Sequence, residues 1–265
     1  MMRLWRKLAA ILVVYWARAL EYRIVILIWI LATTVPLVMM GVWMQLASTG
    51  DIGGYSRGDF IAYYMANLLL LHLVSTWHGP ELSRHIRQGE LNPLLLKPFH
   101  PLWIYALRPL PTKPLRLPIF LPPIILVAWL VPGVHYDLRP ITWLALGIAM
   151  AVAYAITFLA QTALALLAFW MAQAEPLIVL WFHLRMLFSG YLVPIALFPE
   201  SVTRLLFWLP FRYTLSLPLE IITGKLPQGE WLPALGMGLA WVAFFYGVTW
   251  LLWRAGVRAY TAVGA

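Results

Sequence analysis

Two groups of side chains in this sequence could do chemistry. The first is a charged cluster within the stretch 79–89, where Gly79-Pro80 is typical of a helix start and Gly89 of a helix end. Its members are Glu81, Arg84, His85 and Arg87, and the first three are spaced to share one helix face. Such a helix directly below a membrane span could receive force from a soluble partner. The local sequence taken alone favours a solvated loop.

The second group is His183 and Arg185, which lie in an otherwise apolar stretch. An Arg inside hydrocarbon costs at least ~2.5–3.5 kcal/mol, so Arg185 must face protein, water or the interface. One interpretation puts both residues on a cavity wall, near a transported anionic or zwitterionic group. The other is snorkelling, or a structural hydrogen bond to a neighbouring helix. Candidate partners for that bond are Asn67, Thr157 and Gln161.

Several kinds of chemistry have no support in the sequence. The P-loop pattern G-x-x-x-x-G-K-[ST] and the zinc motif H-E-x-x-H do not occur, there is no Cys, and the six His show no ligand spacing. All ten Asp and Glu fall outside the apolar stretches or at their ends, whereas ion-coupled carriers usually place an acid inside the membrane. We therefore expect no catalytic residue, no metal site and no cofactor in this chain.

The composition is that of an integral membrane protein. Of the 265 residues, 63% are apolar and 11% are charged, and the mean hydropathy is +0.81. A soluble domain is about 45–50% apolar and about 25% charged, so soluble enzymes and disordered proteins are excluded. The 15 Trp and 12 Tyr suit a chain that crosses several membrane–water interfaces.

Apolar stretches of about 20 residues predict transmembrane helices. We expect an all-α membrane protein that forms a single transmembrane domain over residues 1–265. The third of its spans is the weakest, because it contains four Pro. The six expected spans are 24–46, 60–78, 117–134, 143–170, 176–196 and 231–253.

Three further segments complete the expected architecture. Residues 1–22 alternate basic and apolar positions at helical spacing and predict an interfacial helix, although a signal peptide or a longer first span would also fit. Residues 79–116 form a loop that contains the short charged helix. Residues 197–226 are apolar but divided by Pro, which is typical of a segment that dips into the membrane and returns, or of a loop that shields the outer face.

The basic residues predict the orientation. With a cytoplasmic N-terminus, thirteen of the 19 Lys and Arg lie on the cytoplasmic side and five on the outer side, with Arg185 inside a span. This split satisfies the positive-inside rule. We expect both termini in the cytoplasm, and the basic character indicates topology and anionic lipid rather than nucleic acid.

The order of these elements resembles the permease subunit of an ABC transporter of the ABC-2 class, whose members are mostly exporters in bacterial inner membranes. The resemblance covers nearly the whole chain. Within this class, the chain is similar to a bacterial branch whose substrates are poorly defined. Its most specific stretches are IRQGELNPLLLKPFHP (86–101), SGYLVPIALFPESVTRLLFWLPFRYTLSLPLEIITG (189–224) and the C-terminal WRAGVRAYTAVGA.

The resemblance implies roles that composition does not show. The N-terminal helix would be an elbow helix, and the helix after span two would be a coupling helix seated on a separate ATPase. Spans two and five would line a path at a dimer interface, and 197–226 would be re-entrant helices that cap it. Contacts to the ATPase would come from Glu81, Arg84, Arg87 and Glu90. The path and its gate would involve His183, Arg185, Phe188, Tyr191, Leu192 and Pro194.

The same resemblance implies the partners and the mechanism. Two permease chains, identical or paralogous, would pair above two ATPase subunits that bind ATP and Mg²⁺, and alternating access would move a cargo through the membrane. An aromatic and aliphatic lining (Phe182, Leu187, Phe188 and Tyr191) favours a hydrophobic or amphiphilic cargo, such as a lipid-like molecule, drug or antibiotic. Two other classes remain open: a membrane scaffold that does not transport, and a membrane-embedded enzyme of lipid metabolism.

Overall fold

The chain, seen in a computed structural model, is a bundle of α-helices over the residues that the structure describes, 34–260. These residues contain no β-strand beyond an isolated bridge between Ile52 and Tyr55. The all-α class predicted from composition is confirmed. The interfacial helix predicted over residues 1–22 lies outside the described residues.

The longer helices are, in chain order, α3 (Thr34–Leu46), α4 (Arg57–Val74), α5 (Gly79–Arg87), α7 (Leu102–Leu107), α8 (Leu117–Leu130), α9 (Pro140–Leu166), α10 (Glu175–Phe188), α11 (Glu200–Trp208), α12 (Ser216–Ile222) and α13 (Gln228–Tyr260). Single turns complete the described chain: α6 (Asn92–Leu95), η1 (Leu110–Thr112), η2 (Pro114–Arg116), η3 (Leu167–Phe169), η4 (Ile195–Leu197) and η5 (Arg212–Thr214).

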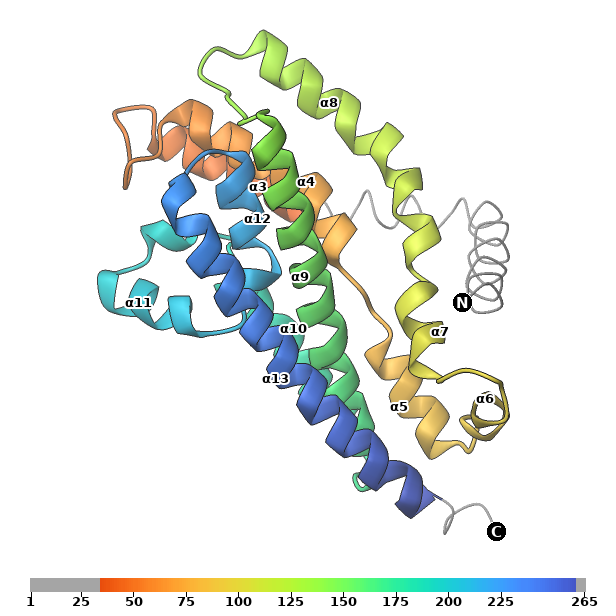
Figure 1. Cartoon of the computed structure of the whole chain (residues 1–265). Helices are drawn as coiled ribbons and strands as arrows, with labels where there is room; N and C mark the ends of the chain where they lie inside the picture. The colour runs from red at the N-terminus through yellow and green to blue at the C-terminus, as the bar shows by residue number, and fades with distance from the viewer. Residues whose placement is uncertain (1–33, 261–265) are drawn as a thin grey trace.

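Helix α9 lies at the centre of the bundle (Figure 1). It packs along α13 and also contacts α4, α5, α10 and α12, and the small residues Ala149, Ala153 and Ala160 let these neighbours approach closely. The buried side chains form one large cluster around α4, α9 and α12, a second around α5 and the C-terminal half of α9, and a third between α4 and α8. Helix α8 lies at the edge of the bundle, and most of its side chains are exposed.

Within residues 34–260, four helical stretches are long and apolar enough to cross a membrane, and the six expected spans are not confirmed. They are 57–87, 102–130, 140–169 and 228–260. At 1.5 Å per residue, the 14 residues of α10 reach only about 21 Å, short of the ~30 Å hydrocarbon core. The described part of the first expected span is the 13-residue α3.

The fifth expected span differs from the observed structure because α10 ends at Phe188 rather than continuing to 196. Gly190 follows with φ +86°, a left-handed conformation that stops an α-helix. Residues 191–194 then continue without helical structure. The third expected span differs too, because α8 ends at Leu130 and is preceded by α7 and two single turns of the same helical stretch.

The start of α4 is fixed by a capping box. The Ser56 hydroxyl accepts a hydrogen bond from the Asp59 amide at 3.2 Å, and the Asp59 carboxylate accepts one from the Ser56 amide at 2.9 Å. Residues 54–58 read G-x-S-x-G, the pattern of a hydrolase nucleophile elbow. The Ser56 hydroxyl instead donates to Asp59 at 2.8 Å, and no strand precedes it within the described residues. The pattern here is a helix cap.

The first turn of α4 also touches the backbone of the turn that follows α8. A Cβ placed on Gly58 would lie 2.2 Å from the carbonyl oxygen of Gly133, so only glycine fits there. Because the obstacle is backbone and not a flexible side chain, the two segments cannot separate cheaply.

Gly58→Ala is therefore expected to destabilise the fold by about 1–3 kcal/mol, the range for overpacking. Gly147→Ala is the matched control, because Gly147 lies in α9 with open space around its Cβ position. Melting temperatures of the two purified variants in detergent measure the difference. Equal melting temperatures for both variants would contradict the close contact.

Candidate functional site

The bundle is interrupted where α4 ends, and the freed backbone carbonyls are capped by side chains. The carbonyl of Ser75 accepts from Lys113 Nζ at 3.0 Å, and that of Leu73 accepts from the same ammonium group. The carbonyl of His72 accepts from Arg116 Nη1 at 2.8 Å, and Gln161 Nε2 donates to the Thr76 carbonyl at 2.8 Å. Without these donors, the break would leave backbone groups unsatisfied inside an apolar bundle.

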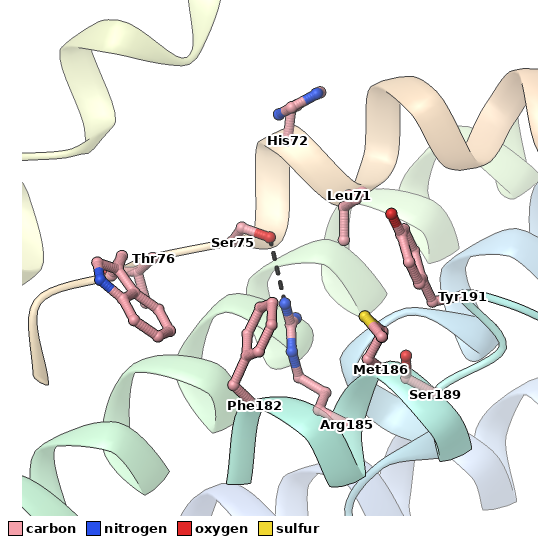
Figure 2. A pocket seen from close by; sticks show the side chains of 10 residues that line it. Leu71, His72, Ser75, Thr76, Phe182, Arg185, Met186, Ser189 and Tyr191 are labelled. Atoms are coloured by element: carbon pink, nitrogen blue, oxygen red, sulfur yellow. Dashed lines mark hydrogen bonds between the residues drawn. The ribbon is translucent and has the colours of Figure 1, made fainter. Parts of the chain in front are cut away.

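A cavity of about 390 Å³ opens beside this break, between the end of α4 and α10. Figure 2 shows Phe182, Arg185 and Met186 on α10 facing the last turn of α4. The surface that faces the cavity is mostly apolar. The ten lining residues are Leu71, His72, Ser75, Thr76, Trp77, Phe182, Arg185, Met186, Ser189 and Tyr191.

Arg185 is the fully charged side chain of this cavity, and it is 6% exposed. Its Nη2 donates to Ser75 Oγ at 3.4 Å, the dashed line in Figure 2, and its Nη1 is buried with no hydrogen-bond partner among the described residues. Arg185 is therefore buried and faces protein, as we expect from the free-energy cost of placing a charge in hydrocarbon.

The hydrogen-bond partners expected for Arg185 were wrong. Asn67 Nδ2 donates to the Tyr191 carbonyl at 3.2 Å, and the Thr157 hydroxyl donates to the carbonyl one turn earlier in its own helix. Gln161 caps Thr76, as described above. Each of these three side chains donates to a backbone carbonyl. The side chain that accepts from the Arg185 guanidinium is Ser75.

The residues expected at the path and gate are only partly brought together. Arg185 and Tyr191 line the cavity, but His183 does not: its side chain is exposed, and Nδ1 lies 2.8 Å from the Val179 carbonyl of the preceding turn. Phe188 packs against Phe198 and Phe211 instead. The expected grouping of His183 and Arg185 on one wall is wrong, because residues two apart on a helix point in different directions.

Leu192 and Pro194 lie in the irregular segment that follows α10, and α4 holds this segment from the side. The hydroxyls of Tyr63 and Tyr64 donate to the carbonyls of Gly190 (2.7 Å) and Leu192 (2.5 Å), while Asn67 bonds the carbonyl between them. We call these three carbonyls the carbonyl ledge. Side chains from one helix thus replace the bonds that α10 loses when it stops.

The segment between α10 and α13 lines the cavity through Ser189 and Tyr191. Buried Arg212 donates to Glu220 at 2.6 Å, and the Ser216 hydroxyl donates to the same carboxylate at 2.7 Å. Burial opposes the charge of Arg212, but the nearby Glu220 carboxylate outweighs it and raises the pKa of the guanidinium. Every residue of α12 except Glu220 is buried. Helix α12 is therefore part of the bundle core rather than a loop over it.

At the opposite end of the bundle, a short helix is present where one is predicted. Helix α5 buries Leu82 and Ile86 against the second hydrophobic cluster and exposes a charged face. Arg87 bonds the Glu175 carboxylate and the Ala172 carbonyl, so α5 is tied to the start of α10.

The other predicted contact residues of this helix also have intramolecular partners, with one exception. Glu81 accepts from Arg108 at 2.5 Å, and Glu90 pairs with His85 at 3.3 Å. Arg84 is exposed and makes no hydrogen bond or ion pair within residues 34–260. It is the member of the predicted set that is available to a partner.

A comparison with known families assigns the chain. The sequence profile of the ABC-2 family transporter protein matches residues 30–264. The chain belongs to the ABC-2 family. No curated protein sequence matches it. As an ABC-2 permease it is a transmembrane transport subunit, a class that is generally not catalytic itself. The described residues contain no group of three His, Asp or Glu that could hold a metal ion.

Several residues of the ABC-2 permease site cannot be found from the sequence. The local sequence predicts that an ordinary span ends with Ser75, Thr76 and Trp77, because it contains no signal that the helix stops before them. The one signal available is the row of polar positions Tyr63, Tyr64 and Asn67, whose spacing puts hydrogen-bonding groups along one side of an apolar helix. Such groups must find partners inside a membrane protein.

The carbonyl ledge can be tested with Tyr63→Phe combined with Tyr64→Phe. The change leaves two carbonyls without donors, which costs about 1–3 kcal/mol each and should loosen residues 189–194. Because the chain has no Cys, a single Val193→Cys reports this through its thiol-labelling rate. We expect faster labelling in the double variant.

Tyr246→Phe serves as the control, because Tyr246 is 62% exposed on α13. The labelling rate should not change in this variant. A double variant that labels no faster than this control would show that the ledge is held by something other than the two hydroxyls.

Proposed function

We propose that this ABC-2 permease is the transmembrane half of an ATP-driven exporter for a hydrophobic or amphiphilic substrate. Two such chains, identical or paralogous, would form the path, and two separate ATPase subunits would bind ATP and Mg²⁺. The membrane would be the bacterial inner membrane, with both termini in the cytoplasm.

The observation that carries the proposal is that α5 is joined to both walls of the cavity. On one side, four residues connect α5 to the end of α4, and three of them (Ser75, Thr76 and Trp77) line the cavity. On the other side, Arg87 ties α5 to the start of α10, which carries Phe182 and Arg185. Movement of α5 would therefore move the two walls relative to each other.

The packing of α5 makes it suited to transmit that movement. His78, just before α5, is fully enclosed: Nε2 lies 2.8 Å from Thr162 Oγ1, and the ring stacks on Phe158 at 4.4 Å. A short helix that is anchored by such contacts moves together with its neighbours and does not unfold locally when force is applied to it.

The arrangement of charges supports the proposed orientation. Helix α5 and the last turns of α13 share the second hydrophobic cluster, through Ile86 and Tyr260 among others, so the basic residues of both lie at one end of the bundle. The starts of α4, α9 and α13 lie toward the other end (Figure 1). The richly basic end is the one that the positive-inside rule assigns to the cytoplasm.

The lining supports the proposed class of cargo. Leu71, Phe182 and Met186 give the cavity apolar walls, and Trp77 is half exposed beside it. A small hydrated ion would gain little from such walls, whereas an alkyl or aromatic body would be removed from water.

Arg84→Glu tests the ATPase contact most cleanly, since it changes an exposed charge without breaking an internal bond. We expect a P-loop ATPase to co-purify with the wild-type chain in mild detergent and to be lost, by about tenfold or more, from the variant. Mass spectrometry and ATPase activity of the eluate measure this.

Arg204→Glu is the control, an exposed reversal on α11, far from α5 along the bundle, which breaks only a solvent-exposed pair with Glu200. It should retain the ATPase. If no ATPase accompanies the wild-type chain under conditions that preserve a known complex, the exporter proposal fails. Loss from both variants would mean that overall charge, not α5, controls binding.

The link to α10 has its own test. A single Trp77→Cys at the cavity mouth should label at different rates with and without a non-hydrolysable ATP analogue. Arg87→Glu should abolish that difference, because it breaks the bond from α5 to Glu175, and adding Glu175→Arg should restore it. A nucleotide response that persists unchanged in Arg87→Glu would show that movement does not pass through this pair.

A further inference from the structure

We propose that the cavity between the end of α4 and α10 binds the oxyanion of an acidic amphiphile, with Arg185 holding the anionic group and the aromatic mouth holding the apolar body. This inference rests on the proposed function and narrows its cargo from any hydrophobic molecule to one with a single negative head.

The first argument is an incomplete set of hydrogen bonds. A guanidinium has five N–H donors in a planar fork that matches an oxyanion in two places. Arg185 is more than nine-tenths buried, its Nη1 has no partner within the described residues, and its bond to Ser75 is long at 3.4 Å. A buried charge left so poorly paired is costly, and an anion entering the cavity would relieve that cost.

The second argument is the sign of the surrounding charge. No Asp or Glu lines the cavity. Lys113 and Arg116 both reach the same end of α4, where they bond the carbonyls of Ser75 and His72. The end of a helix carries a partial charge of only about −0.5, so the Arg116 guanidinium there and Arg185 beside it are enough to leave the region positive. A cationic head would be repelled by this arrangement, and a neutral head would gain a hydrogen bond but no charge attraction.

The third argument separates an amphiphile from a free oxyanion. Phe182 and Trp77 meet edge to face at 5.3 Å, and Trp77 is 51% exposed, so apolar surface extends from the guanidinium to the cavity mouth. Inorganic phosphate would leave these rings in contact with water, whereas an alkyl chain attached to the anion would cover them. Figure 2 shows Phe182 beside Arg185 and below Ser75, where such a chain would pass.

The experiment uses Trp77 as its own reporter. The full-length chain, in its purified assembly, is placed in phosphatidylcholine nanodiscs and titrated with dibromostearate or its methyl ester at alkaline pH. Bromine quenches nearby Trp, and subtracting the signal of Trp77→Phe isolates the cavity. We expect the acid to bind roughly 10- to 100-fold more tightly than the ester, as for a buried charge-assisted hydrogen bond.

Arg185→Gln should remove this preference, and Arg185→Lys should keep part of it, because lysine retains the charge but not the fork. Arg204→Gln, on exposed α11, should leave the preference intact. Equal binding of acid and ester by the wild type, or an unchanged preference in Arg185→Gln, would overturn the proposal. Displacement of the acid by an equal concentration of inorganic phosphate would overturn the amphiphile assignment.

Two further measurements keep the result unambiguous. If Arg185→Gln does not fold, Met186→Phe narrows the cavity with Arg185 in place. It should weaken dibromostearate binding about tenfold or more, and unchanged binding would overturn the proposal. Co-purification of the ATPase is scored on the same samples. An ATPase that remains bound while acid preference is absent refutes the anionic site alone, whereas loss of the ATPase from wild type refutes the exporter.

Discussion

The structure depends on how a helix is allowed to stop inside an apolar bundle. Helix α4 ends at Val74. The Ser75 amide still bonds the Leu71 carbonyl and the His78 carbonyl accepts from the Leu82 amide, but the carbonyls of Ser75 and Thr76 between them accept from side chains instead. In a membrane, each unsatisfied carbonyl costs several kcal/mol, so the break is possible only where other elements supply donors. Lys113, Arg116 and Gln161 supply them from two different parts of the chain. These bonds fix the position of the 102–130 helical stretch and of α9 against α4.

The same solution is used a second time where α10 stops. There the donors are Tyr63, Tyr64 and Asn67 on α4, and the acceptors are the carbonyls of residues 190–192. The two breaks lie on either side of one cavity, because α4 both ends beside it and holds the segment that closes it. Irregular backbone in a membrane protein is tolerated where protein or a cavity surrounds it, and here side chains of neighbouring helices supply the donors at each break. The cavity thus lies where side chains bond the backbone carbonyls at the two breaks. Beside it, Arg185 keeps a buried N–H donor that has no partner among the described residues.

This arrangement also supports the proposal that a short helix at one end of the bundle transmits movement to the middle of it. Helix α5 follows the break in α4 directly and is bonded to the start of α10 through Arg87. Rigid elements that meet at both walls of a cavity pass a displacement to it without any change in their own fold. Packing of the second hydrophobic cluster around α5 keeps that connection stiff.

Composition and hydropathy alone determined that this chain is an all-α membrane protein, and the order of its motifs determined the family. A helix from Pro80 to Gly89 was also predictable, because Pro, Gly and charge spacing act within a few residues. The sequence does not show where the helices end: 176–196 is mostly apolar, yet α10 ends at Phe188, where the left-handed Gly190 lies against Tyr63 and Ser216 from other elements. The sequence indicated that Arg185 must be buried. It did not indicate that Ser75 bonds the Arg185 guanidinium, or that His183 lies outside the cavity. Local sequence sets what each residue must satisfy, and only the tertiary structure decides which distant group satisfies it.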